Sequence, residues 1–293
     1  MNYLIIALLC LFSGASMAQS PVFLVLAVKG KVSSAGKPVG VGQKLSSKQS
    51  LILEDQAQVG LMLSNGKTAE LNQPGTYALD EMAARLSAQK DFKDKYTDYV
   101  VKGITQKTTD SKHQKFMALT GSVERGFNKS DIAIQLPFKS DLLLPEMQVW
   151  WSDEHPSTTY HLVVMNMKEE VVHHQNISQA NASIDWSNIH PAPDQYYLLC
   201  VIDSVARRKS EYAYVYIPES KEREKRMAEE QEFKSALDID QPVSHLALAA
   251  FYKSHRSYAE MVSAMKKAME QFPNHALLSE AMENMIAEMR EDR

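Results

Sequence analysis

Glycine is concentrated near the N-terminus of this chain, and that distribution limits the fold more than any other feature. Most of the 11 glycines lie between Gly30 and Gly75, and none follows Gly126. Glycine adopts positive φ without steric cost, so it marks tight turns and bulges between strands. Short apolar runs alternate with these glycines from Val28 to Tyr77. The pattern predicts a small all-β module over residues 19–80.

A hairpin is the clearest local signal in this module. Every second residue from Val59 to Leu63 is a branched apolar one, so these side chains point to one face of a strand. The pair Asn65 and Gly66 is typical of a type I′ turn, and residues 67–71 then return as the second strand.

The order of turns and strands in this module resembles the periplasmic domain of FecR-like proteins. The resemblance rests on a Gly-x-Val opening, a glycine-rich loop before a leucine, and an apolar strand that ends in Asn-Gly. It covers about a fifth of the chain, and its matching residues are Ala57, Val59, Leu61, Leu63, Asn65 and Gly66. The resemblance implies a periplasmic interaction domain. The cytoplasmic and membrane-anchoring segments of the family's signalling members are not expected here.

Residues 1–18 have the pattern of a signal peptide. An apolar core from Leu4 to Phe12 precedes Ser16-Met17-Ala18, which predicts cleavage before Gln19. The core is shorter than the roughly 20 residues of a membrane span, although an uncleaved anchor is the alternative. We therefore expect a periplasmic protein, with secretion possible, and no transmembrane segment in the mature chain.

Charge and cysteine content limit which partners and which cross-links the chain can have. The whole net charge of −4 lies in residues from Glu219 onward, and no basic segment stands out, so a nucleic-acid partner is not expected. Only Cys200 remains after cleavage, which excludes an intramolecular disulfide. A mature chain of about 275 residues predicts two or three domains.

Residues 81–118 are predicted to form a helical connector and a loop. Asp80 is expected to cap the first helix, and Gly103 is expected to end the last one. The loop falls between Lys107 and Lys115. The apolar residues at helical spacing are Met82, Leu86, Phe92, Tyr96, Tyr99 and Val100.

Residues 119–218 are predicted to form a β-sandwich that opens with a strand and turn from Leu119 to Gly126. Strand-like runs recur every eight to twelve residues or so, which is typical of that architecture. The region resembles fibronectin type III and related immunoglobulin-like domains. The resemblance implies a core tryptophan, Trp150 or Trp151, and a corner tyrosine, Tyr196 or Tyr197.

Chemically reactive side chains in the sandwich do not predict an active site. His173, His174 and His190 with Asp185 or Asp194 could be imagined as a metal cluster, but adjacent histidines on a strand point to opposite faces. Cys200 lies in an apolar run, as a buried thiol does. No metal, no cofactor and no catalytic residue is expected, and the chain is interpreted as a non-enzyme.

Residues 219–293 are predicted to be helical. The spacing of Leu248, Tyr252, Tyr258, Ala268 and Pro273 resembles one tetratricopeptide repeat, and a third helix is expected from Ala276 to about Met289. Methionines recur every three or four residues on the last two helices. They either fill the core of the hairpin or form an adaptable surface for a partner.

Two functional hypotheses follow. The first is an exported scaffold or adaptor that binds envelope proteins through the helical tail and the exposed edges of the β modules. Its candidate partner-binding residues are Tyr252, Tyr258, Met261, Met265, Met282, Met285 and Met289. The second is a glycan or peptidoglycan binder whose exposed aromatic rings stack on sugars. Its candidate residues are Trp151, Tyr160 and Trp186.

Overall fold

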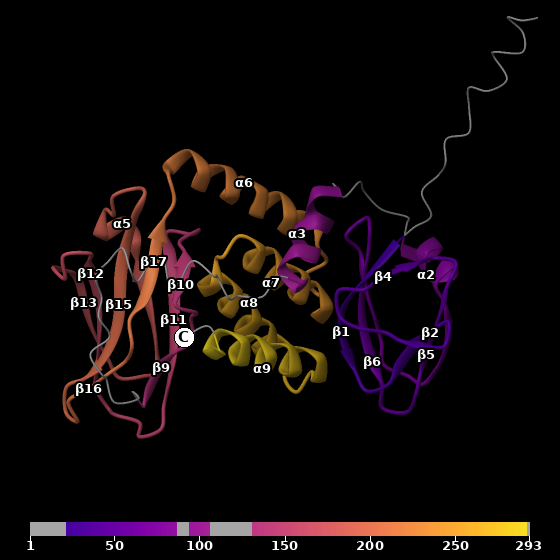
Figure 1. Cartoon of the computed structure of the whole chain (residues 1–293), viewed down its shortest axis with the longest axis horizontal. Coiled ribbons are helices and arrows are strands. Elements are labelled where there is room, and N and C mark those ends of the chain that lie inside the picture. The colour runs from indigo at the N-terminus through magenta and orange to yellow at the C-terminus, as the bar shows by residue number, and fades with distance from the viewer. Residues whose placement is uncertain (1–21, 87–93, 106–130, 292–293) are drawn as a thin grey trace, which may run out of the picture.

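The structure, a computed structural model, describes residues 22–86, 94–105 and 131–291. Figure 1 shows three regions in a row: an N-terminal β module at one end, a β-sandwich at the other, and helices between them. The N-terminal two thirds are β-rich and the C-terminal part is helical, as predicted. The predicted signal peptide and the strand expected from Leu119 to Gly126 lie outside the described residues.

The N-terminal module consists of two four-stranded antiparallel sheets, with the orders β4-β1-β6-β7 and β3-β2-β5-β8. Its strands are β1 (Val22–Lys29), β2 (Val32–Ser34), β3 (Lys37–Pro38), β4 (Lys44–Ser46), β5 (Ser50–Leu53), β6 (Gln58–Leu63), β7 (Thr68–Leu71) and β8 (Gly75–Ala78).

Strands β1 and β6 are buried on both faces. Phe23 and Leu61 point into the core between the two sheets, whereas Leu24 and Met62 belong to a second core that includes the helices. Because alternate side chains of a strand point to opposite faces, both sets must be apolar. Burial on both faces explains why the first strand is an almost continuous apolar run.

The connector contains helices α2 (Leu79–Leu86) and α3 (Asp94–Thr105). Asp80 lies in the first turn of α2 rather than at its cap. Gly103, predicted to end a helix, lies inside α3, where a Cβ atom would be 1.8 Å from the carbonyl oxygen of Ala250. This glycine is needed for close helix packing and does not terminate the helix.

Strands β6 and β7 form the predicted hairpin, but the prediction of a type I′ turn is wrong. That turn needs positive φ at both central residues. Here Gly66 has φ 82°, but the φ of Asn65 is not positive. The N–H of Leu63 donates to the carbonyl of Lys67 at 2.7 Å, which closes a three-residue loop. The side-chain amide of Asn65 donates to the carbonyl of Leu86 at 3.0 Å, so contact with α2 stabilises the longer loop.

The sandwich has one sheet in the order β10-β17-β15-β12-β13, with β16 beside β15, and a second in the order β14-β11-β9. Trp151 and Tyr197 are buried, whereas Trp150 and Tyr196 are half-buried. Its elements are β9 (Ile132–Ile134), β10 (Lys139–Asp141), β11 (Glu146–Asp153), β12 (Tyr160–Asn166), β13 (Val171–Ile177), β14 (Asn181–Asp185), α5 (Trp186–Ile189), β15 (Gln195–Asp203), β16 (Arg208–Lys209) and β17 (Ala213–Ile217).

The helical region lies between the two β regions in space, although it comes last in sequence (Figure 1). Its first helix leaves the sandwich and buries Phe233 against Tyr96 of α3 and Phe251 of α7, with ring centroids 5.3 and 4.8 Å apart. Within the described ranges, no helix has both the length and the apolar composition needed to cross a membrane. The helices are α6 (Ser220–Ala236), α7 (Pro242–Ser254), α8 (Tyr258–Gln271) and α9 (Ala276–Glu291).

One hydrophobic core runs from the module through the helices into the sandwich. Polar contacts support both junctions. At the module, the Thr68 and Ser244 hydroxyls are 2.8 Å apart, and His275 Nε2 lies 2.8 Å from Glu70 Oε2. At the sandwich, the buried carboxylate of Asp141 accepts hydrogen bonds from two arginines of the helical region. The helices therefore hold the two β regions in a fixed relation.

Candidate functional site

The helical residues predicted to bind a partner lie inside the molecule. Tyr252, Tyr258, Met261, Met265, Met282 and Met289 are at most 4% exposed. Met285 is half-buried and lines a groove described below. The methionine stripes fill the shared core, so they offer no external binding face in this conformation.

The aromatic residues predicted to bind a glycan are buried as well. Trp151, Tyr160 and Trp186 are 3%, 2% and 1% exposed. Tyr160 packs edge-on against Trp151, and its hydroxyl donates to Asp153 Oδ2 at 2.9 Å. None of the three rings presents a face on which a sugar could stack.

A cavity of about 710 Å³ lies between strand β11 and helices α7 and α8. We call it the sandwich cleft. Its volume is within the range of small-molecule and peptide side-chain sites. Apolar side chains line it together with a larger number of polar and charged ones, including three glutamates and three lysines. Those used below are Met147, Trp150, Tyr252, Glu260, Ser263 and Lys266.

Glu260 is the most unusual group in this cleft. It is 6% exposed, and its Oε1 accepts hydrogen bonds from the backbone N–H groups of Leu143 and Leu144 at 3.2 and 2.9 Å. Its other oxygen, Oε2, is buried and has no hydrogen-bond partner. Burial raises the pKa of Glu260 to about 7, so the group changes charge near neutral pH.

Two other polar arrangements border the cleft. The Tyr252 hydroxyl donates to Glu230 Oε1 at 2.6 Å, and Lys234 pairs with the same oxygen at 2.7 Å. Burial raises the pKa of Tyr252. Lys266 Nζ lies 5.8 Å from the centre of the Trp150 ring, and burial lowers the pKa of this lysine. The wall of the cleft therefore combines an indole ring, a half-buried amine and a buried carboxyl group whose Oε2 has no hydrogen-bond partner.

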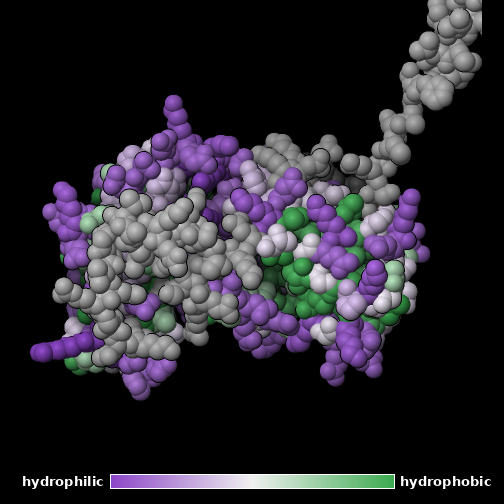
Figure 2. Space-filling view, viewed as in Figure 1, coloured by the Kyte–Doolittle hydropathy of each residue, from purple (hydrophilic) through white to green (hydrophobic). Residues whose placement is uncertain are grey.

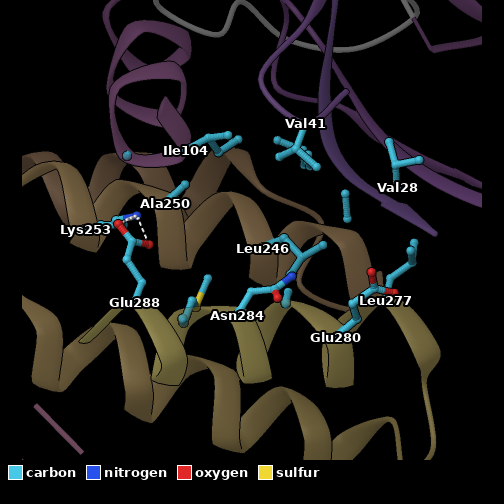
Figure 3. Close-up of a pocket in the computed structure, with 15 residues that line it drawn as sticks. Val28, Val41, Ile104, Leu246, Ala250, Lys253, Leu277, Glu280, Asn284 and Glu288 are labelled. Atoms are coloured by element: carbon cyan, nitrogen blue, oxygen red, sulfur yellow. Dashed lines mark hydrogen bonds and ion pairs between the residues drawn. The ribbon is translucent and has the colours of Figure 1, made fainter. Parts of the chain in front are cut away.

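A second, smaller cavity of about 160 Å³ lies where the module meets α3, α7 and α9; we call it the module groove. Figure 3 shows Val41 and Ile104 on one side, with Glu280 and Asn284 of α9 opposite. At one end, Lys253 Nζ pairs with Glu288 Oε2 at 2.7 Å. This volume suits a single apolar side chain.

Hydrophobic residues gather on the visible face of the N-terminal module, toward the helices (Figure 2). Val41, which belongs to the module groove, is 53% exposed. An apolar surface beside a groove is typical of an interaction site.

The other reactive groups considered in the sequence do not come together in one site. In the part of the chain that the structure describes, no three His, Cys, Asp or Glu side chains are grouped as metal ligands. Asp185 caps α5 and Asp194 accepts from the Tyr216 hydroxyl, so each serves a local structural role. Cys200 is fully buried, and burial raises the pKa of its thiol to about 11.

Sequence reasoning missed Glu260 and one histidine pair. Glu260 is a single carboxylate in a helix, and its burial depends on the sandwich packing against α8. His161 was not considered, yet its ring lies beside His174 across two strands. That contact depends on the register between β12 and β13, which the sequence pattern does not determine.

Comparison with known proteins does not assign the chain to a family. No protein-family model matches it, and no curated protein matches it either.

Proposed function

We propose that this chain is a non-enzymatic adaptor of the cell envelope that binds a segment of a partner protein in the sandwich cleft. The observation that carries the proposal is the cavity between two regions of one core, with Glu260 at its wall and the Oε2 atom of this residue buried without a hydrogen-bond partner. Such a cavity keeps its shape without a ligand, so little ordering entropy is lost on binding. The periplasmic location belongs to the proposal and follows from the signal-peptide pattern of residues 1–18.

The cleft favours a particular chemistry in its partner. Met147 and Trp150 provide apolar contact, and Glu260 Oε2, which has no partner in this chain, can accept a hydrogen bond when the carboxyl is ionised and donate one when it is protonated. A buried polar atom left unsatisfied costs about 1–3 kcal/mol, which a hydrogen-bonding group of the ligand would recover. The expected partner segment has an apolar body and one hydrogen-bonding side chain.

Site-specific photocrosslinking in living cells tests the proposal. A photoreactive residue at Ser263 or Gln148, which line the cleft, should give discrete protein adducts. The same residue at the exposed Lys37, on the far module, serves as the control and should not. Ser263→Trp should fill the cleft and abolish capture, whereas Ser263→Ala should retain it.

Two outcomes would contradict the adaptor. Adducts at Lys37 but not at the cleft would place the binding surface elsewhere. Labelling of cell-wall polymer from the cleft, with no protein attached, would favour the glycan hypothesis. In that case the half-buried Trp150 would be the stacking residue, because the three rings predicted for this role are buried.

A further inference from the structure

Two histidines from neighbouring strands meet on the outer face of the sandwich. Strand β12 pairs with β13 so that His161 lies opposite Asn176, and His174 lies opposite Val163. Leu162 belongs to the sandwich core, and alternate side chains of a strand point to opposite faces. His161, His174 and Asn176 therefore project together from the outer face.

The distance between the two histidine nitrogens matches that of metal ligands. His161 Nδ1 lies 3.0 Å from His174 Nε2, and 2.7 Å from Asn176 Oδ1. Two imidazole nitrogens that bind one ion at about 2.0–2.1 Å, with an angle between 90° and 110°, are about 2.9–3.4 Å apart. The two histidines already have the separation of adjacent ligands.

We propose that His161 and His174 form a binding site for a divalent transition metal, with Asn176 Oδ1 as a third ligand and water completing the coordination. Neutral imidazole suits copper, nickel and zinc, and affinities of such sites rise to a maximum at Cu²⁺. Cu²⁺ is therefore expected to bind most tightly. This site is separate from the sandwich cleft and does not depend on its function.

Metal binding would link the outermost strand of this sheet to its neighbour. In the described sheet, β13 pairs with β12 and ends the strand order. An ion that binds the folded pair and not the unfolded chain stabilises the fold in proportion to the logarithm of its concentration. Added Cu²⁺ should therefore raise the melting temperature.

Titration of the purified chain with Cu²⁺, followed by calorimetry and electron paramagnetic resonance, tests the site. The wild-type chain should bind one ion with two nitrogen ligands in its spectrum. His161→Ala and His174→Ala should each remove that spectrum and the rise in melting temperature. His155→Ala, at an exposed position elsewhere in the sandwich, is the matched control and should retain both.

A gain-of-affinity variant keeps the test independent of folding losses. Asn176→Asp replaces a neutral amide oxygen with a charged carboxylate and should tighten Cu²⁺ binding. The proposal is overturned if the wild-type chain does not bind Cu²⁺, or if His161→Ala and His174→Ala bind it as the wild type does.

Discussion

Gly103 of α3 and Ala250 of α7 lie in backbone contact: a Cβ atom on Gly103 would be 1.8 Å from the Ala250 carbonyl oxygen and 2.6 Å from its carbon. Only a residue without a side chain allows this approach. The contact brings the connector into the C-terminal helical region, so segments far apart in sequence form one helical layer between the β regions (Figure 1).

Gly103→Ala should destabilise the protein by about 1–3 kcal/mol or more, because the clash is with backbone atoms that cannot rotate away. In an exposed helix a change from glycine to alanine would stabilise the protein by roughly 1 kcal/mol. The sign of the stability change therefore distinguishes a close helix crossing from an exposed position. Urea unfolding measures it. Gly40→Ala is the control: no atom lies within 4 Å of its Cβ position, and stability should change by less than about 0.5 kcal/mol.

Asp141→Asn should weaken the junction between the sandwich and the helices. The Asp141 side chain is 1% exposed and pairs with Arg226 at 3.1 Å and Arg256 at 3.0 Å. Loss of its charge removes the carboxylate that the two arginines share, but Arg226 keeps its pair with Glu222 at 2.9 Å, so the cost should be about 1–3 kcal/mol. Thermal unfolding should show a lower midpoint. Glu81→Gln, which removes an exposed pair with Arg85, should cost less than about 1 kcal/mol.

The pH dependence of stability should report Glu260. Its folded pKa of about 7 lies above the ordinary 4.5, so the folded state holds a proton that the unfolded state releases. Its contribution is fully present below pH 4.5 and is lost as pH rises to 7, by an amount on the order of 3 kcal/mol.

Urea unfolding at several pH values compares the wild type with Glu260→Gln. The variant should lose this part of the pH dependence, because glutamine keeps an acceptor for the Leu143 and Leu144 N–H groups without ionising. Glu270→Gln, at the exposed rim of the same cleft, should leave it unchanged. An identical slope in Glu260→Gln and wild type would contradict the assignment.

Cys200 should resist thiol reagents in the folded protein. It has no exposed surface, and burial raises its pKa to about 11, so little thiolate forms at pH 8. In a Cys10→Ser background, labelling with a chromogenic disulfide should be slow in buffer and fast in guanidinium chloride. Equally fast labelling in both would show that β15 opens under native conditions.

Local signals predicted the hairpin of the module and the start of the last helix. The alternation from Val59 to Leu63 placed three side chains in the module core, as observed. Helix α9 begins at Ala276, as expected, and Pro242 is the first residue of α7. These features depend on steric and hydrogen-bond preferences within a few residues.

Features that depend on distant contacts could not be predicted. The spacing of Met261 and Met265 indicates that one face of α8 is apolar, but not which surface covers it. Glycine is common both at helix ends and where two helices cross closely, so the residues around Gly103 did not distinguish the two. His161 and His174 meet only because β12 and β13 adopt one register. The candidate cleft combines strands and helices more than a hundred residues apart, so its geometry was absent from any local pattern.

The outer face of the N-terminal module has a consequence for how the protein is made. Leu24 and Met62 lie on strands that contact helix α9, which follows them by more than two hundred residues. During synthesis this apolar sheet face stays open to water until helices α7 and α9 have been made. Open apolar faces recruit chaperones or other nascent copies. The cell must therefore protect the unfinished chain until these helices pack, and products truncated before Ala276 should be cleared as misfolded protein.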